Sequence, residues 1–323
     1  MKIKNIGGEF GLINRIKDRI RLYSQDVVIG IGEDAAVLKY DKKNYLIFTT
    51  DTLVENVHFS LKYFNPKQIG MKAIEQNVSD IAAMGGLPKF ALVSLSLPNG
   101  IDVEFVDALY DGFNEKSKKY KISIVGGDIT HSKEIAISIS LIGFVEKGYL
   151  TLRSGAKVND LVFCTGSVGS SSVGLEMLRH NLKGESIKKH IWPECRLKLA
   201  RELAKFGVNS MIDVSDGVAS EVRYICKQSS VGAIIYADEI PISKNALIDS
   251  KKLKKDAVDF ALYGGEDFEL VFTAQKNKLN QLKKYDVIAI GEIVHKKYGI
   301  KLVKDGKKLN LGSGFDHFKR LEV

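Results

Sequence analysis

Several apolar, strand-like runs in this 323-residue chain end in an acidic residue that has a glycine or another small residue beside it. These acids are Asp34 in GIGEDAAV, Asp51 in IFTTD, Asp128 in VGGD, and Asp213 and Asp216 in IDVSDG, and GGEDFEL adds Glu266 and Asp267 before another strand. A single acid of this kind is usually a turn or helix-cap residue. Acids that meet at one end of a sheet repel each other unless cations lie between them. Because Mg²⁺ prefers hard oxygen ligands and phosphates, the recurrence predicts a shared site for magnesium and phosphate.

Other polar residues extend this predicted site. Thr49 and Thr50 precede Asp51 and offer hydroxyl or carbonyl oxygens. Asp80 follows Asn77 by three residues in a helical pattern, so the two side chains share a face.

Three further residues have a structural interpretation, and two of them also have a functional one. His58 is a base, a ligand or a substrate contact, or else a structural histidine. Arg153, in TLRSGA, is a phosphate clamp or a surface arginine. Phe315, in GSGFDHF, is by default a core aromatic residue.

Strand-like and helical patterns follow one another irregularly, which indicates an α+β fold and not a doubly wound one. Strands are expected at 27–31, 45–50, 90–97, 122–125, 135–145, 161–165, 211–214, 232–237, 269–273 and 287–290. Helices are expected from Pro66 to the Gly85–Gly86 pair, from 102 onward, over 171–180 and 194–206, and after Asp216. The length favours two domains, divided near 146–156 into residues 1–148 and 149–323.

Two glycine-rich segments are similar to nucleotide-binding loops. GIGEDA fits the pattern G-x-G-x-x-A, but Glu33 and Asp34 would face the pyrophosphate that this pattern holds. Those acids suit a phosphate bound through a metal. TGSVGSSSVGL stands between a strand and a helix and lacks G-K-[ST], so it is either a phosphate cradle or a plain tight turn.

Composition narrows the class of protein. The net charge is +9, with lysine clusters at 116–121 and 251–255 that lack a nucleic-acid-binding motif. We interpret them as solvated surface and expect no nucleic-acid partner. No apolar run reaches the length of a membrane span, and the first 22 residues lack the apolar core of a signal peptide. A cytoplasmic protein without a membrane partner is expected, and three scattered cysteines predict neither a disulfide framework nor a zinc site.

Taken in order, the motifs resemble the thiamine-monophosphate kinase family, which shares a superfamily with aminoimidazole-ribonucleotide synthetase. They are GGEFGLI, GIGEDAAV, TTDTLVENVHF, NVSDIAAMGG, GGD, LTLRSGA, TGSVGSSSVGL, IDVSDG, GGEDFEL and GSGFDHF, and they extend over nearly the whole chain. The resemblance implies a two-domain, PurM-like α+β fold. It implies a homodimer in which two N-terminal sheets join into a barrel, with ATP and several Mg²⁺ ions between the domains.

The same resemblance implies roles for individual residues. The implied metal ligands are Asp34, Thr49, Thr50, Asp51, Asp80, Asp128, Asp213 and Asp216, of which Asp51, Asp80 and Asp213 are the implied catalytic residues. The implied ATP contacts are Tyr110, Gly127, Asp128, Arg153 and Ser215. The implied contacts to thiamine monophosphate are His58, Glu266 and Phe315.

Two positions depart from the family pattern. The family usually has Gly-Asp-Asp where this chain has Gly32-Glu33-Asp34, so the ligand role falls to Asp34. A tyrosine or tryptophan is common where Phe315 stands, so stacking on the thiamine ring is retained and a hydroxyl contact is lost.

The implied reaction is the ATP-dependent phosphorylation of thiamine monophosphate to thiamine diphosphate by direct in-line transfer. The acceptor phosphate has a second pKa of about 6 and needs no general base. Two alternatives remain: another ATP-dependent enzyme of the superfamily, such as one similar to aminoimidazole-ribonucleotide synthetase, and a non-catalytic module that binds nucleotide or cations.

Overall fold

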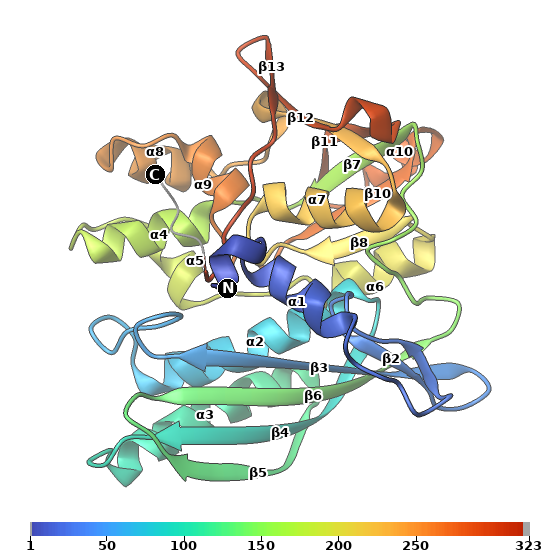
Figure 1. Ribbon diagram of the computed structural model, residues 1–323. Coiled ribbons are helices and arrows are strands. Elements are labelled where there is room, and N and C mark those ends of the chain that lie inside the picture. The colour runs from blue at the N-terminus through green and yellow to red at the C-terminus, as the bar shows by residue number, and fades with distance from the viewer. Residues whose placement is uncertain (1, 319–323) are drawn as a thin grey trace.

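Residues 2–318, which the computed structural model describes, contain two sheets, each with its own helices (Figure 1). The first sheet has the strand order β1-β2-β3-β6-β4-β5. Its strands are β1 (Val27–Ile29), β2 (Ala36–Lys39), β3 (Asn44–Val54), β4 (Leu87–Leu97), β5 (Ser123–His131) and β6 (Ala136–Glu146). Neighbouring strands are antiparallel except β4 and β5, which are parallel.

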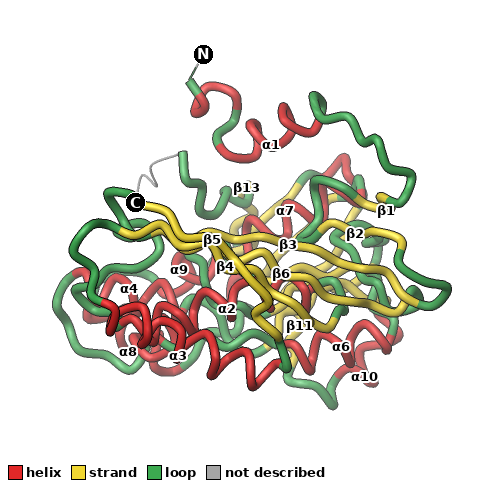
Figure 2. The backbone as a smooth tube through the Cα atoms, turned by 90° about the horizontal axis from the view of Figure 1, so that it is seen from below, coloured by secondary structure: helices red, strands yellow, loops and turns green. Residues whose placement is uncertain are grey.

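Alternation along the strands decides which face of this sheet is buried. In β6, Ile137, Ile139 and Leu141 are buried and alternate with half-buried residues, as the sequence predicts. Helices α2 (Pro66–Ala83) and α3 (Val103–Tyr120) lie on one side of the sheet (Figure 2). The buried residues of β3, β4 and β6 pack against α2 to form the core of this first unit.

Helix α2 begins where the sequence places it because its first turn is fully capped. The Asn65 side chain accepts a hydrogen bond from the Gln68 backbone N–H at 2.9 Å, and the Gln68 side chain accepts one from the Asn65 N–H at 2.9 Å. Pro66 occupies the first helical position, where no backbone N–H is needed. Gly85, with φ of 71°, ends the helix in a conformation that glycine adopts readily.

The second sheet lies within residues 160–310 and has the order β13-β12-β9-β11-β7-β10-β8. Its strands are β7 (Asp160–Thr165), β8 (Ser210–Asp213), β9 (Gly232–Tyr236), β10 (Leu270–Gln275), β11 (Val287–Val294), β12 (Ile300–Lys304) and β13 (Lys307–Asn310). The helices of this unit are α4 (Ser170–Arg179), α5 (Ile187–Ile191), α6 (Leu197–Phe206), α7 (Val218–Ser229), α8 (Lys244–Lys252), α9 (Ala257–Tyr263) and α10 (Leu279–Leu282). Short 3₁₀ turns are η1 (Ile3–Ile6), η2 (Ala237–Glu239), η3 (Lys276–Lys278) and η4 (Lys296–Tyr298).

Helices cover both faces of the second sheet. Apolar residues of α7 and α9 pack on one face, and those of α6 and α10 pack on the other. Ala82 and Ala83, at the end of α2, belong to the second of these clusters. The end of α2 is therefore held between the two units.

Helix α1 (Glu9–Lys17) precedes the first sheet in the chain but contacts the second unit. The ring of Phe10 meets that of Tyr224 edge-on at 5.0 Å, and the Glu9 N–H donates to Asp316 Oδ1 at 3.2 Å. The amino-terminal segment therefore lies beside α7 and the carboxyl-terminal loop. None of the helices described is long and apolar enough to cross a membrane.

Several sequence expectations about strand ends were wrong: β11 continues beyond 290 to Val294, β4 begins before 90 at Leu87, and two further strands carry predicted ligands. The strand expected at 45–50 continues to Val54, and the one expected at 122–125 continues to His131. Asp51 and Asp128 therefore lie within strands and not after them. The physical reason is pairing: β3 is matched with β6 along its whole length, so the ladder carries the polar residues with it.

Candidate active site

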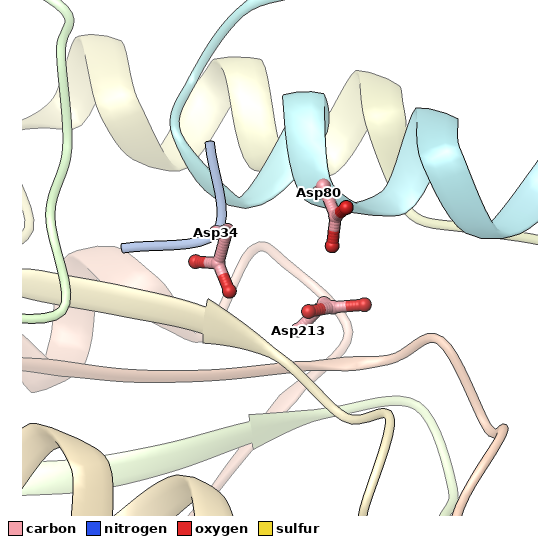
Figure 3. Close-up of side chains that lie close together, drawn as sticks. All are labelled: Asp34, Asp80 and Asp213. Carbon is pink, nitrogen blue, oxygen red and sulfur yellow. The ribbon is translucent and has the colours of Figure 1, made fainter. Parts of the chain in front are cut away.

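Three acidic side chains from distant parts of the chain meet between the two units (Figure 3). Asp34 stands before β2, Asp80 lies on α2, and Asp213 is the last residue of β8. One carboxylate oxygen from each lies within 4.8 Å of the others. The first unit thus contributes two acids and the second unit contributes one.

Hydrogen bonds fix each of these acids in place. The Thr49 hydroxyl donates to Asp80 Oδ2 at 2.6 Å. The Ser79 hydroxyl donates to Asp213 Oδ2 at 2.6 Å, which joins α2 to β8. Arg153 Nε donates to Asp34 Oδ1 at 3.0 Å. These partners orient the carboxylates of the cluster.

The cluster fits a divalent cation. Asp34 Oδ2 is buried and, within the described part of the chain, has no hydrogen-bond partner. Burial raises the pKa of Asp213 to about 8, and burial together with neighbouring carboxylates raises the pKa of Asp80 well above its usual range. Removal of water and mutual repulsion both oppose ionisation here, and a bound cation would relieve both.

The acidic cluster predicts how stability depends on pH in the metal-free protein. The pKa of Asp51 is raised by burial to about 6, and that of Asp213 to about 8. The folded protein then binds more protons than the unfolded chain between about pH 4 and pH 8, so the free energy of unfolding falls as pH rises through that window. We expect 10 mM MgCl₂ to raise the melting temperature by about 3 °C or more at pH 8, and by less at pH 5.

The measurement is thermal unfolding in EDTA and in MgCl₂ at both pH values. Potassium chloride at matched ionic strength is the control, because it screens all charges without occupying the site. A magnesium effect that is absent, or larger at pH 5, would show that these acids do not bind the ion.

Thr49, Thr50 and Asp51 are consecutive in β3, so their side chains alternate between the two faces of the sheet. Thr49 is buried and faces the cluster, and Asp51 shares that inner face. Thr50 is exposed on the outer face, where its hydroxyl accepts a hydrogen bond from Ser140 at 3.3 Å. The Thr50 hydroxyl faces away from the acidic cluster, so only the backbone carbonyl of Thr50 is available as a ligand there.

The loop after β8 is held by an acid that sequence reasoning missed. Glu221, 1 % exposed on α7, accepts hydrogen bonds from the N–H groups of Ser215 at 3.3 Å and Asp216 at 2.9 Å. Burial, followed by the charges of Asp216 and Asp213, raises the pKa of Glu221 well above its usual range. An acid in the first turn of a helix that follows SDG was the available signal, since such acids often bind the free amides there.

Arg153 lies at the cluster and not on the open surface. Its guanidinium is ion-paired with Asp34 and lies 4.8 Å from the Tyr224 ring centroid. Its backbone N–H donates to Glu33 Oε2 at 2.8 Å. Glu33 thus positions the Arg153 segment, while the next acid, Asp34, faces the cluster.

The loop TGSVGSSSVGL is not a phosphate cradle in this structure. Asp267 accepts hydrogen bonds from the N–H groups of Gly169 at 2.5 Å and Ser171 at 3.0 Å at the start of α4. A buried carboxylate therefore occupies the amides that an anion would need. The same hydrogen bonds give Asp267 a structural role, because its carboxylate caps the start of α4.

His58, Glu266 and Phe315 converge on a second group of side chains. The ring of His58 lies 5.1 Å from that of His317, and the ring of Phe315 lies 4.9 Å from His317. Lys72 connects Glu266 to the backbone of His58, because its Nζ lies 2.6 Å from Glu266 Oε1 and donates to the His58 carbonyl at 2.7 Å. We call the group formed by these five residues the acceptor pocket, after the role that we propose for it below.

The protonation of His58 follows from its surroundings. Its Nδ1 accepts a hydrogen bond from the Val54 N–H at 3.0 Å, so in the neutral ring the proton lies on Nε2. Burial lowers the pKa of His58 to about 4. At neutral pH His58 is therefore an uncharged hydrogen-bond donor, and not a general acid.

Known proteins match almost the whole length of this chain. Residues 32–145 match the AIR synthase related protein N-terminal domain, and residues 157–303 match the corresponding C-terminal domain. The chain is 36% identical to the thiamine-monophosphate kinase of Aquifex aeolicus, over 98% of this chain and 100% of that protein. It is 38% identical to the Bacillus subtilis thiamine-monophosphate kinase, over 96% of this chain and 99% of that protein. The chain belongs to the thiamine-monophosphate kinase family.

A solved structure supports the same assignment in three dimensions. It is described as AaThiL complexed with AMPPCP and TMP, and it superimposes with a TM-score of 0.87 at 36% identity. The match covers 98% of this chain and 99% of that one. The two mixed sheet-and-helix units are therefore the fold of the thiamine-monophosphate kinase family.

Not every residue that the family resemblance assigns to ATP lies at the cluster within one chain. Gly127 and Asp128 lie on β5, an edge strand, and Asp128 is exposed. In the strand register Asp51 is opposite Ile139, which is opposite Val93, which is opposite Gly127. Three inter-strand spacings, about 14 Å along the sheet, therefore separate Asp51 from this pair.

Tyr110 is also separate from the cluster. It lies on α3, which packs on the far side of α2, and its ring meets that of Phe113 edge-on at 5.1 Å. Within one chain this thiamine-monophosphate kinase family member brings together Asp34, Thr49, Asp51, Asp80, Arg153 and Asp213, with Ser215 and Asp216 on the adjoining loop.

Proposed function

We propose that this protein is an ATP-dependent kinase that phosphorylates thiamine monophosphate to thiamine diphosphate. The observation that carries the proposal is that an acidic cluster with the donor set of a cation site stands next to the acceptor pocket in a chain of this family. The loop 215–216 of the cluster contacts the pocket directly, because the Glu266 N–H donates to the Ser215 carbonyl at 2.8 Å and the Phe315 N–H donates to the Asp216 carbonyl at 3.1 Å. Backbone hydrogen bonds to the loop 215–216 therefore join the proposed donor and acceptor sites.

The side chains of the cluster have distinct tasks in this proposal. Asp34, Asp51, Asp80 and Asp213, with oxygens from the segment 49–50 and Asp216, would hold Mg²⁺. When bound, Mg²⁺ neutralises the phosphates and stabilises the charge that develops during in-line transfer. Arg153, held against Asp34, adds a fixed positive charge for the ATP phosphates.

The acceptor pocket orients the second substrate. Phe315 presents an aromatic face to the thiamine rings, and the Glu266 carboxylate accepts a hydrogen bond from the aminopyrimidine. The neutral His58 donates from Nε2 to the acceptor phosphate. The acceptor oxygen is already ionised at neutral pH, so the chain does not need to remove a proton and the transfer is direct.

The test is to incubate the purified protein with ATP, MgCl₂ and thiamine monophosphate and to measure thiamine diphosphate by chromatography. We expect product that depends on all three additions. An absence of thiamine diphosphate, together with ATP turnover on another acceptor, would reject the proposal.

We further propose a homodimer in which two first sheets join into a barrel. The outer face of this sheet exposes large apolar side chains, Phe48 at 41 %, Leu92 at 46 % and Ile129 at 69 %. Strand β5 is at the edge and so has unpaired backbone groups on one side. A second copy would cover both, and would bring its own Asp128 towards the cluster of the first chain.

This arrangement predicts complementation between two inactive variants. Asp51→Asn and Asp128→Asn should each be nearly inactive alone. Mixing and re-equilibrating equal amounts gives half heterodimers, each with one intact site, so about a quarter of wild-type activity should return. No recovery, with heterodimers demonstrated by differential tags, would place Asp128 outside the site of the partner.

The remaining proposals concern organisation. We propose that residues 1–148 form the ATP, metal and dimerisation domain and that residues 149–323 complete the cleft. We also propose a cytoplasmic location, where ATP is available.

A further inference from the structure

Lys72 is a fully buried lysine, with an exposed fraction of 0 %, on the face of α2 that meets the second unit. Its Nζ contacts Glu266 Oε1 at 2.6 Å and donates to the His58 carbonyl at 2.7 Å. The same Nζ lies 5.4 Å from the centre of the Phe64 ring. A buried ammonium is costly unless paired, and here its partners belong to the acceptor pocket.

The pair is accessible from one side only. The Glu266 side chain is 27% exposed, whereas that of Lys72 is 0% exposed. A ligand in the acceptor pocket can therefore touch the Glu266 carboxylate but not the Lys72 ammonium behind it. Lys72 must act through Glu266 and His58.

The backbone of Glu266 is also held in a demanding conformation. Its φ is 63°, in the left-handed region that residues with a side chain avoid. The preceding Gly265 has no room for a side chain, since a Cβ there would lie 1.9 Å from the Ser215 carbonyl oxygen. The loop conformation therefore restricts the direction of the Glu266 side chain, and the contact with Lys72 holds its carboxylate in place.

We propose that Lys72 is a positioning residue that fixes the Glu266 carboxylate in the acceptor pocket and ties it to the segment carrying His58. The proposal rests on the proposed function and names a specificity determinant for its acceptor site. Without Lys72, the partly buried Glu266 carboxylate would lose its cation, turn or take up a proton, and could no longer accept a hydrogen bond from the aminopyrimidine in the same way.

The charges around Glu266 support this role. The groups that face it are Lys72 from α2, His190 from α5, His58 from the loop after β3, and Tyr63. Burial raises the pKa of Glu266, but Lys72, then His190 and His58, outweigh it, so the net pKa is lowered. Burial lowers the pKa of His190 to about 3 and that of His58 to about 4, so both imidazoles are uncharged at neutral pH and neither replaces Lys72 as the cation beside Glu266.

The test compares Lys72→Met with a matched control in steady-state kinetics. For Lys72→Met we expect the KM for thiamine monophosphate to rise about tenfold to a hundredfold, with the KM for Mg·ATP within about twofold of wild type. The acid limb of kcat/KM for thiamine monophosphate should also move to higher pH, because the pKa of Glu266 rises when its cation is removed.

Lys116→Met is the control. Lys116 is 5 % exposed and pairs with the fully buried Glu75 at 2.8 Å, so the variant also leaves a buried carboxylate without its lysine. This pair joins α2 to α3 and does not contact Glu266 or His58. We expect a comparable loss of melting temperature and a KM for thiamine monophosphate within about twofold of wild type.

A double variant tests whether Lys72 acts through Glu266. Lys72→Met with Glu266→Gln should have the same KM for thiamine monophosphate as Glu266→Gln alone, within about twofold. This variant buries no unpaired charge, so it decides the question if Lys72→Met alone does not fold.

An unchanged KM in Lys72→Met, an equal rise in Lys116→Met, or a further rise in the double variant over Glu266→Gln would each overturn the proposal. These outcomes count only if the wild-type protein forms thiamine diphosphate. A wild-type protein without that activity rejects the proposed function itself, and binding of thiamine monophosphate by calorimetry to the wild-type and Lys72→Met proteins then decides the role of Lys72.

Discussion

The Asp51→Asn variant is expected to turn over at least about a hundredfold more slowly than the wild type at saturating MgCl₂. Asp51 lies within β3 on the same face as Thr49, whose hydroxyl binds Asp80 at 2.6 Å. An amide has the same shape as a carboxylate but no charge, so it cannot neutralise a cation at the phosphates. The measurement is kcat for thiamine diphosphate formation over a range of MgCl₂ concentrations.

The same substitution should leave the fold intact and raise the stability of the metal-free protein. Asp51 is partly buried and raises the pKa of Asp80, so removal of its charge relieves repulsion within the cluster. We expect a higher melting temperature than wild type in EDTA. Asp107→Asn, on the exposed side of α3, is the control and should alter neither quantity. Near-normal turnover in Asp51→Asn would show that this carboxylate is not a metal ligand in the reaction.

Glu266→Gln and Phe315→Ala are expected to raise the KM for thiamine monophosphate by about tenfold to a hundredfold each, which corresponds to one or two lost contacts. The Glu266→Gln variant lacks the negative charge that pairs with Lys72. The Phe315→Ala variant lacks the aromatic face, which contributes about 0.5–2 kcal/mol to binding of a cationic ring. Mg·ATP binding, measured by calorimetry without acceptor, should stay nearly unchanged.

These two variants need a control for general loss of aromatic or acidic side chains. Tyr298→Ala removes a 54 % exposed ring on η4. It should change neither KM. If Glu266→Gln and Phe315→Ala instead bind nucleotide poorly or melt early, the two residues hold the loops at Ser215 and Asp216 in place and the acceptor pocket is elsewhere.

Short-range signals in the sequence were sufficient for most of the secondary structure. Pro66 after Asn65 and the Gly85–Gly86 pair predict both ends of α2, because capping and backbone freedom depend on neighbouring residues. The alternation in β6 likewise predicts which side chains are buried. The recurrence of acids after apolar runs also indicated a common cation site before any of them could be placed.

Only the tertiary structure decided which acids meet, because contacts between residues far apart in the chain depend on topology. Ser79 and Asp213 are separated by 134 positions and yet share a hydrogen bond. Strand register sent Thr50 to the outer face, since a step of one residue reverses the face. It also left Asp128 on an edge strand far from Asp51. Lys72 had no local signal that identifies it, and Glu221 had only its place in the first turn of a helix, because a buried charge is defined by the partners that enclose it.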